Sequence, residues 1–190
     1  MPLARAFNGM SDAQGPRKCR ERGFVWFDPD LTMRPALAES WELSEDGSQW
    51  TWRLRAGTKW SDGTPFTTAD AVWYWEYRLK DEILSPLPPA AYSTGNPSVL
   101  AEFAAVDDET LVLTFAHPNP QFAYRTAWEY LPFTPAHYMQ QFHPAFADQA
   151  ALEAQAKSAG LDTWDKYYAQ MEREALNTGK PCRQHTSETT

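Results

Sequence analysis

Alternating apolar and polar positions mark two β-hairpins in this chain. Around the acidic turn that contains Gly47, the residues Trp50, Trp52 and Leu54 alternate with polar neighbours. Side chains in a strand point alternately to opposite faces, so this period-two pattern predicts a half-buried hairpin. A second alternating run follows another acidic turn, and a short apolar run precedes both hairpins. The predicted strands are residues 24–27, 41–44, 49–55, 102–106 and 111–115.

Between the hairpins the spacing becomes helical. Thr67 and Asp70 have the spacing of a capping box, in which two side chains satisfy free N–H groups at a helix start. A helix is therefore predicted over residues 68–82, with its apolar residues recurring on one face. The predicted apolar face consists of Val72, Trp75, Leu79 and Ile83.

The next segment, residues 85–97, contains four prolines and Gly95. Such a segment can be neither a helix nor a central strand. Long ordered loops inside compact domains are often functional. Beyond Pro120 the pattern is helical again, and Gly160 is placed to end one of the helices. The helices predicted there are residues 121–130, 135–142, 148–159 and 163–176.

These elements predict an α+β fold in which strands and helix share one buried core. With 43% hydrophobic residues and nine tryptophans, the chain has enough apolar surface to offset the entropy of ordering. We divide it into an irregular N-terminus (1–22), one folded unit (23–176) and an irregular tail (177–190). The predicted core residues are Trp41, Trp50, Trp52, Leu54, Val72, Trp75, Leu111, Leu113 and Phe115.

The charge of the chain argues against nucleic acid as a partner. The formal net charge is −8, and nucleic-acid binding needs clustered Lys and Arg to contact phosphates. The single basic cluster, at residues 17–22, is interpreted as a solvated tail. Cys19 and Cys182 lie near opposite ends without further ligands at metal-binding spacing, so we expect no metal site. Two free thiols are favoured over the alternative, a disulfide between the two cysteines, because both lie in the least patterned segments. The sequence has no apolar run of the roughly 20 residues that a membrane span needs.

Acid–base residues do not form a recognisable catalytic motif. The sequence contains no nucleophile elbow, HExxH, P-loop or glycine-rich dinucleotide turn. We therefore expect a protein that is not an enzyme and that needs no cofactor. The residues weighed for catalysis were Asp62, Asp70, Glu76, His117, His137 and His143.

Residues 35–76 carry a specific motif series. It contains Leu-Ala-Glu-Ser-Trp at residues 37–41, the acidic glycine turn, Gly-Thr-Lys-Trp-Ser-Asp-Gly-Thr-Pro-Phe at 57–66, and Thr-Ala-Asp-Ala-Val at 68–72. This series resembles the signature region of the family 5 extracytoplasmic solute-binding proteins, the peptide, dipeptide and nickel-binding group. Weaker similarity extends over about residues 24–176.

The resemblance implies the capture subunit of an ABC importer, with a peptide or similar small solute and the importer's permease subunits as partners. Proteins of this family hold solute between two lobes and work in the periplasm or otherwise outside the membrane. This chain resembles the N-terminal part, mainly the smaller lobe, a partial periplasmic-binding-protein-like lobe. Residues 1–23 lack the apolar core of a secretory signal, so we expect the chain to start and stop inside a longer protein and to lack a complete cleft.

The resemblance also suggests which segments face the solute. In the family, the loop after the signature helix and the segment after the second hairpin approach the cleft. Tyr and Trp offer both stacking area and a polar tip to a bound molecule. Any single one of these residues is more readily explained by packing against the other lobe, so the prediction concerns the two segments more than their individual members. The candidate ligand-binding residues are Tyr92, Ser93 and Asn96 in the first segment, and Trp128, Tyr130 and Phe133 in the second.

One other interpretation stays open. Tryptophans on β-hairpins can stack on sugars, so the chain could be a stand-alone carbohydrate-binding or interaction module. A platform of that kind needs its aromatic side chains exposed together on one sheet face. The exposure of Trp50 and Trp52 therefore distinguishes this module from a solute-binding lobe.

Overall fold

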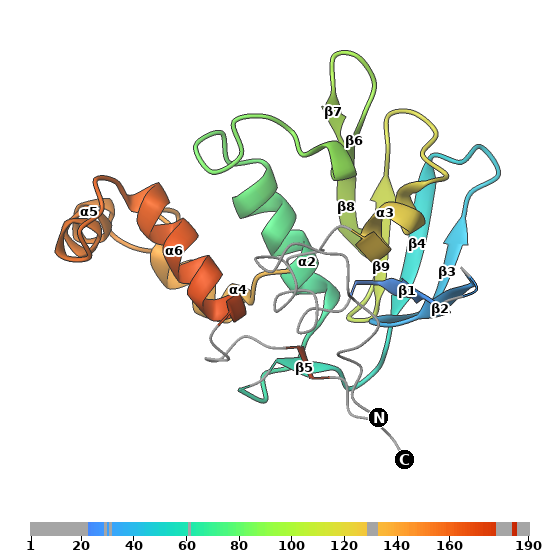
Figure 1. Ribbon diagram of the computed structural model, residues 1–190, viewed down its shortest axis with the longest axis horizontal. Helices are drawn as coiled ribbons and strands as arrows, with labels where there is room; N and C mark the ends of the chain where they lie inside the picture. The colour runs from blue at the N-terminus through green and yellow to red at the C-terminus, as the bar shows by residue number, and fades with distance from the viewer. Residues whose placement is uncertain are drawn as a thin grey trace.

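The computed structural model describes residues 23–28, 30, 32–60, 62–128, 133–177 and 184–185. The predicted irregular N-terminus, both cysteines and Tyr130 lie outside the described residues, and so does the side chain of Trp128. The fold is α+β, as predicted, with a sheet on one side and a helical unit on the other (Figure 1).

A four-stranded antiparallel sheet in the order β3-β4-β9-β8 forms the first part of the fold. Both predicted hairpins are confirmed, β3 with β4 and β8 with β9. The two hairpins join through β4 and β9, where Trp50 pairs with Leu113 and Trp52 with Leu111. Gly47 turns the first hairpin with a φ of 71°, a conformation that disfavours a Cβ. The strands are β3 (Ala38–Leu43), β4 (Gln49–Leu54), β8 (Glu102–Ala105) and β9 (Thr110–Thr114).

Three smaller two-stranded sheets surround this one. The predicted strand at residues 24–27 is confirmed as β1. The proline-rich loop ends in a short hairpin, β6 with β7, rather than remaining irregular throughout. In the predicted irregular tail, the described residues 184–185 form a short strand, β10, which pairs with β5, so the prediction is wrong for these two residues. The strand pairs are β1 (Val25–Phe27) with β2 (Met33–Pro35), β5 (Lys59–Trp60) with β10 (Gln184–His185), and β6 (Ser93–Thr94) with β7 (Val99–Leu100).

The signature helix α2 (Thr68–Tyr74) begins at the predicted capping box, whose two hydrogen bonds are both present. It continues as a π-helical turn, η2 (Trp75–Leu79), and ends earlier than predicted. The carboxylate of Asp81 then accepts the backbone N–H groups of Ile83 and Leu84, both at 2.8 Å, and closes a turn. Ile83 is consequently 60% exposed, and its assignment to the buried face is wrong.

The remaining helices follow the sheet in sequence. Gly160 ends α5 with a φ of 77°, as its position predicted. No helix in the described ranges is long and apolar enough to cross a membrane. The elements are η3 (Ala90–Tyr92), α3 (Phe122–Trp128), α4 (Ala136–Met139), η4 (Gln140–Phe142), α5 (Gln149–Ser158) and α6 (Trp164–Asn177).

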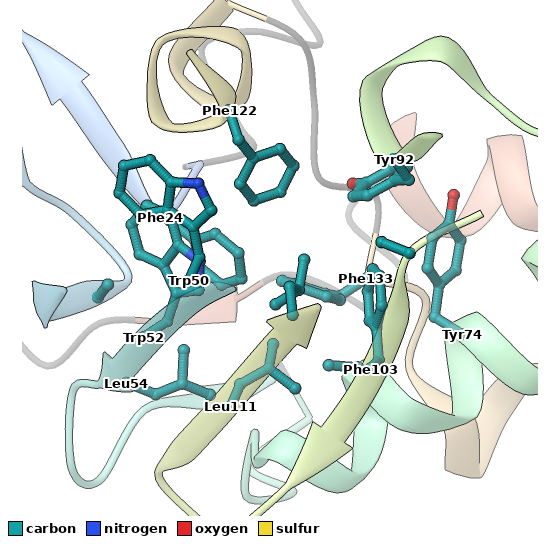
Figure 2. Packing of buried hydrophobic residues seen from close by; sticks show 14 of the residues in the cluster. Phe24, Trp50, Trp52, Leu54, Tyr74, Tyr92, Phe103, Leu111, Phe122 and Phe133 are labelled. Carbon is teal, nitrogen blue, oxygen red and sulfur yellow. The ribbon is translucent and has the colours of Figure 1, made fainter. Parts of the chain in front are cut away.

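The main core lies between the sheet, α2, α3 and β1, and the residues predicted for it belong to it or pack against it. Figure 2 shows part of this core, including Trp50, Trp52, Leu54 and Leu111. Trp41, Val72 and Trp75 are partly buried against it, and the other six are buried. Trp50 and Trp52 are only 4% and 0% exposed. Because both are buried, they cannot form a sugar-stacking platform. The exposure that would favour a stand-alone carbohydrate-binding module is therefore not found at these two residues.

A second core, which the sequence did not predict, belongs to the helical unit. It joins α4, η4, α5 and α6, and Trp73 of the signature helix packs against it. α2 therefore contributes side chains to both cores. The buried members are Met139, Phe142, Leu152, Trp164 and Tyr168.

The buried carboxylate of Asp70 ties three segments together. Its Oδ2 accepts Trp60 Nε1 of β5 at 3.2 Å and the backbone N–H of Thr67 at 3.1 Å. Its Oδ1 accepts the backbone N–H of Ala136, at the start of α4, at 3.3 Å. Burial raises the pKa of Asp70, and these hydrogen bonds oppose the rise. One side chain thus fixes the start of α2, β5 and the residues that precede α4.

We expect Leu113→Ala to lower the free energy of unfolding by about 2–5 kcal/mol, because it empties part of a fully buried site. Leu87→Ala is the matched control. Leu87 is 80% exposed, so its loss should change stability by less than about 0.5 kcal/mol. Urea unfolding followed by tryptophan fluorescence measures both. Equal losses in the two variants would contradict the assignment of the core.

Asp70→Ala should lower the free energy of unfolding by about 1–3 kcal/mol, because three donors lose their acceptor in a buried site. Asp162→Ala is the control. Asp162 forms an exposed ion pair with Lys166, and such pairs contribute about 0–1 kcal/mol. The same urea titration applies, and an Asp70→Ala variant as stable as Asp162→Ala would show that Asp70 does not fix this junction.

Candidate functional site

The loop after the signature helix is anchored at both ends. Tyr92 N donates to Pro89 O at 2.9 Å, and Ala101 N donates to Tyr92 O at 2.7 Å. The indole of Trp75 donates to the carbonyl of Ala101 at 2.7 Å and ties the end of the loop to η2. The loop is therefore an ordered part of the lobe.

Two of the three candidate residues in this loop point inward. Tyr92 is buried, with its ring centroid 5.6 Å from that of Phe103 and 6.0 Å from that of Phe122. Ser93 is also buried, and its hydroxyl donates to the carbonyl of Pro89. Asn96, in contrast, is exposed in the turn that joins β6 and β7.

The turn that carries Asn96 packs against the segment after β9. Thr94 Oγ1 accepts the backbone N–H of His117 at 3.2 Å. Gly95 has a φ of 93°, and a Cβ added there would lie 2.9 Å from Cδ2 of His117. Glycine is thus required both for the backbone conformation and for the close approach. This contact sets the position of Asn96 relative to the sheet.

The second candidate segment also contributes to packing. Phe133 is 1% exposed, and its ring centroid lies 5.4 Å from that of Phe24 and 5.6 Å from that of Phe66. The two segments are linked, because Arg125 Nη1 of α3 donates to the carbonyl of Ala90 in η3 at 3.0 Å.

The structure therefore brings the two predicted segments together through the main core. Tyr92 and Phe133, named from different segments, are both members of that core (Figure 2). Their burial explains them as packing residues of this lobe. Of the candidates whose side chains are described, Asn96 is the one exposed at the surface. Tyr130, like the side chain of Trp128, lies outside the described residues.

The residues weighed for catalysis are used in local interactions. Nε2 of His137 lies 2.7 Å from Oδ2 of Asp62 in a partly exposed pair that the sequence gave no signal for. Burial raises the pKa of Asp62, but hydrogen bonds from Thr64 and His137 outweigh it and leave the pKa lowered. Glu76 pairs with Lys80 at 2.7 Å along the helix. Among the described residues, no group of three or more His, Cys, Asp or Glu side chains could hold a metal ion.

Comparison with known proteins gives this geometry its context. Residues 32–173 match the model of the bacterial extracellular solute-binding proteins, family 5. The chain is 34% identical over 126 residues to a probable deoxycholate-binding periplasmic protein of Escherichia coli, across 60% of this chain and 24% of that one. It is 37% identical over 120 residues to a periplasmic alpha-galactoside-binding protein of Rhizobium meliloti, across 62% and 17%.

Solved structures agree. An oligopeptide-binding protein superposes with a TM-score of 0.73 at 30% identity, across 85% of this chain and 25% of that one. A periplasmic binding protein of Agrobacterium fabrum, solved with stachyose, superposes with a TM-score of 0.57 at 28% identity, across 80% and 22%.

The matched region thus covers most of this chain but only 17–25% of the length of these relatives. The signature residues lie where the family resemblance predicted, in the hairpin, the glycine turns and the capped helix. Because the family model matches residues 32–173, which are most of the chain, this chain belongs to the bacterial extracellular solute-binding proteins of family 5.

Proposed function

We propose that this chain forms the supporting lobe of the solute-binding component of an ABC importer. The observation that carries the proposal is the superposition on an oligopeptide-binding protein, with a TM-score of 0.73 over 85% of the chain. The chain corresponds to about a quarter of that protein's length. In this proposal a further lobe completes the cleft, and the importer's permease subunits receive the solute.

The proposed solute is a peptide or a related small molecule. The relatives are named for oligopeptides, an alpha-galactoside and deoxycholate, so one scaffold serves several solute classes. Some residues of the family signature, such as Glu39 and Lys59, are exposed, and others, such as Trp52 and Trp60, are buried. The buried ones support the lobe.

Binding, not catalysis, is the proposed activity. The relatives are binding proteins by name, and in this lobe Asp70 caps a helix while Asp62 and His137 pair with each other. Several of those relatives are periplasmic, so we place the working protein outside the cytoplasmic membrane. Asn96 and Tyr130 are the residues we propose closest to the solute, one in each segment.

The chain alone should not bind solute tightly, because one lobe buries only part of a ligand. Isothermal titration calorimetry with dipeptides, oligopeptides and stachyose should give no binding at a Kd of roughly 1 µM or tighter, which corresponds to about −8 kcal/mol. The oligopeptide-binding protein of Escherichia coli serves as the positive control. A micromolar complex with the isolated chain would contradict the proposed need for a second lobe.

The proposed contact of Asn96 can be tested in a chimera. Residues 32–173 replace the matching region of the Escherichia coli oligopeptide-binding protein. Asn96→Ala should weaken peptide binding by about ten-fold if its amide contacts the solute. Glu42→Ala, an exposed position on β3, should leave binding unchanged.

Each outcome of the chimera has a separate meaning. A folded chimera that binds no peptide contradicts the role of supporting lobe. Equal affinity in the Asn96→Ala and Glu42→Ala variants, with binding intact, removes Asn96 from the site but keeps the proposed function.

A further inference from the structure

A buried histidine lies between the signature helix and the helical unit. His143 is 4% exposed and follows η4 directly. Its ring is enclosed by aromatic side chains of three segments, with ring centroids 5.6–6.5 Å away and interplanar angles of 62–80°. The enclosing residues are Trp73 of α2, Tyr77 of η2, Phe146 of the following turn, and Trp164 and Tyr168 of α6.

The hydrogen bond at Nδ1 of the ring assigns its tautomer. Nδ1 accepts the backbone N–H of Ala145 at 3.1 Å, so Nδ1 carries no proton. The proton of the neutral ring is therefore on Nε2, which lies 3.4 Å from Oδ2 of Asp81, within ion-pair distance but without forming a hydrogen bond. The other oxygen of Asp81 accepts Ile83 N and Leu84 N, which fixes the carboxylate after η2. The ring thus connects the end of the signature helix to the turn that precedes α5.

A second proton on the ring can bind only at Nδ1, whose lone pair already accepts a hydrogen bond. Protonation at Nδ1 would set its N–H against the N–H of Ala145, so this hydrogen bond must break. The same turn includes Phe146 N and Ala147 N, which both donate to the carbonyl of His143. It leads directly into Asp148, the N-cap of α5. Disturbing the turn therefore disturbs the start of α5.

We propose that His143 is a proton-sensitive latch, which holds α5 and α6 on the signature helix while its ring is neutral and releases them when the ring is protonated. This role is independent of which solute the protein binds. The latch acts within the second core, whereas both candidate solute-facing segments belong to the elements around the main core.

The charges around the ring oppose one another. Burial is the largest effect and lowers the pKa of His143, while the Asp81 carboxylate and the backbone of Tyr77 raise it less. On the η2 and α6 sides, Arg78 Nε lies 3.5 Å from Oε2 of Glu172, so these two charges face each other. Burial also raises the pKa of Tyr168 far above its usual range, so that phenol stays neutral.

The sign of the pH dependence follows from this lowered pKa. Between the ordinary pKa of histidine and the lower folded pKa, the opened state binds more protons than the closed state. The stability that His143 contributes is therefore complete above the ordinary value of 6.5 and is lost as the pH falls through the folded pKa.

Hydrogen exchange measured by mass spectrometry tests the latch in the intact chain, at several pH values from about 8 to 5 with correction for intrinsic rates. Protection of α5 and α6 should fall by up to roughly ten-fold for each pH unit, the limit for one linked proton, while β4 and β9 keep theirs. In His143→Asn this fall should disappear, because the side-chain oxygen can accept from Ala145 N without titrating. His117→Asn, which removes an exposed imidazole, should retain the wild-type response.

Nitrogen-15 NMR of the wild-type imidazoles supplies a second readout that does not depend on a variant. The Nε2-protonated tautomer of His143 at pH 8, titrating together with the loss of protection in α5 and α6, supports the latch. An Nδ1-protonated ring, or an unchanged pH response in a folded His143→Asn variant, overturns it.

Discussion

The packing of the Trp52 indole in the buried face of the sheet is the constraint on which most of the lobe depends. Its ring centroid lies 4.6 Å from that of Phe24, 5.3 Å from Trp50, 5.9 Å from Trp41 and 6.2 Å from Phe122. These rings come from the β1 region, from two strands of one hairpin and from α3. One side chain therefore sets the distances between four segments, and large aromatic surfaces supply the burial that a small sheet needs.

The signature helix connects the core next to the sheet with the second core in the helical unit. Tyr74 packs on Phe133 in the main core, and the preceding residue, Trp73, packs in the second core. Its polar anchors lie at its two ends, with Asp70 at the start and Asp81 just after η2. The helix thus couples two apolar clusters through adjacent side chains that point in different directions. The buried Asp70 and the partly buried Asp81 determine how its ends meet the neighbouring segments.

The sequence predicted those features that depend on neighbours along the chain. Alternation located the hairpins, and the Thr67–Asp70 spacing located the helix start. The exposure of Ile83 could not be predicted from helical spacing, because η2 ends at Leu79 and the Asp81 carboxylate closes a turn after it. The full role of Asp70 was also hidden, since one of its donors, Ala136, is 66 positions away.

The candidate site shows a different limit of sequence reasoning. The family resemblance points to the segments of Tyr92 and Phe133, and aromatic rings there suit a bound molecule, but the same rings also suit a core. Only the three-dimensional arrangement separates the two uses, and it buries both. Asn96, a small polar residue in a turn, is exposed there, and its exposure follows from the strand pairing on either side.

Burial of signature residues such as Trp52 and Trp60 affects which positions of this lobe can vary. Residues that make the family recognisable, such as Trp52 and Trp60, are held by packing and face away from solvent. Substitutions at exposed positions of this lobe can therefore change its surface without disturbing these packing contacts. In this lobe the buried tryptophans of the signature and the exposed surface residues can therefore vary independently.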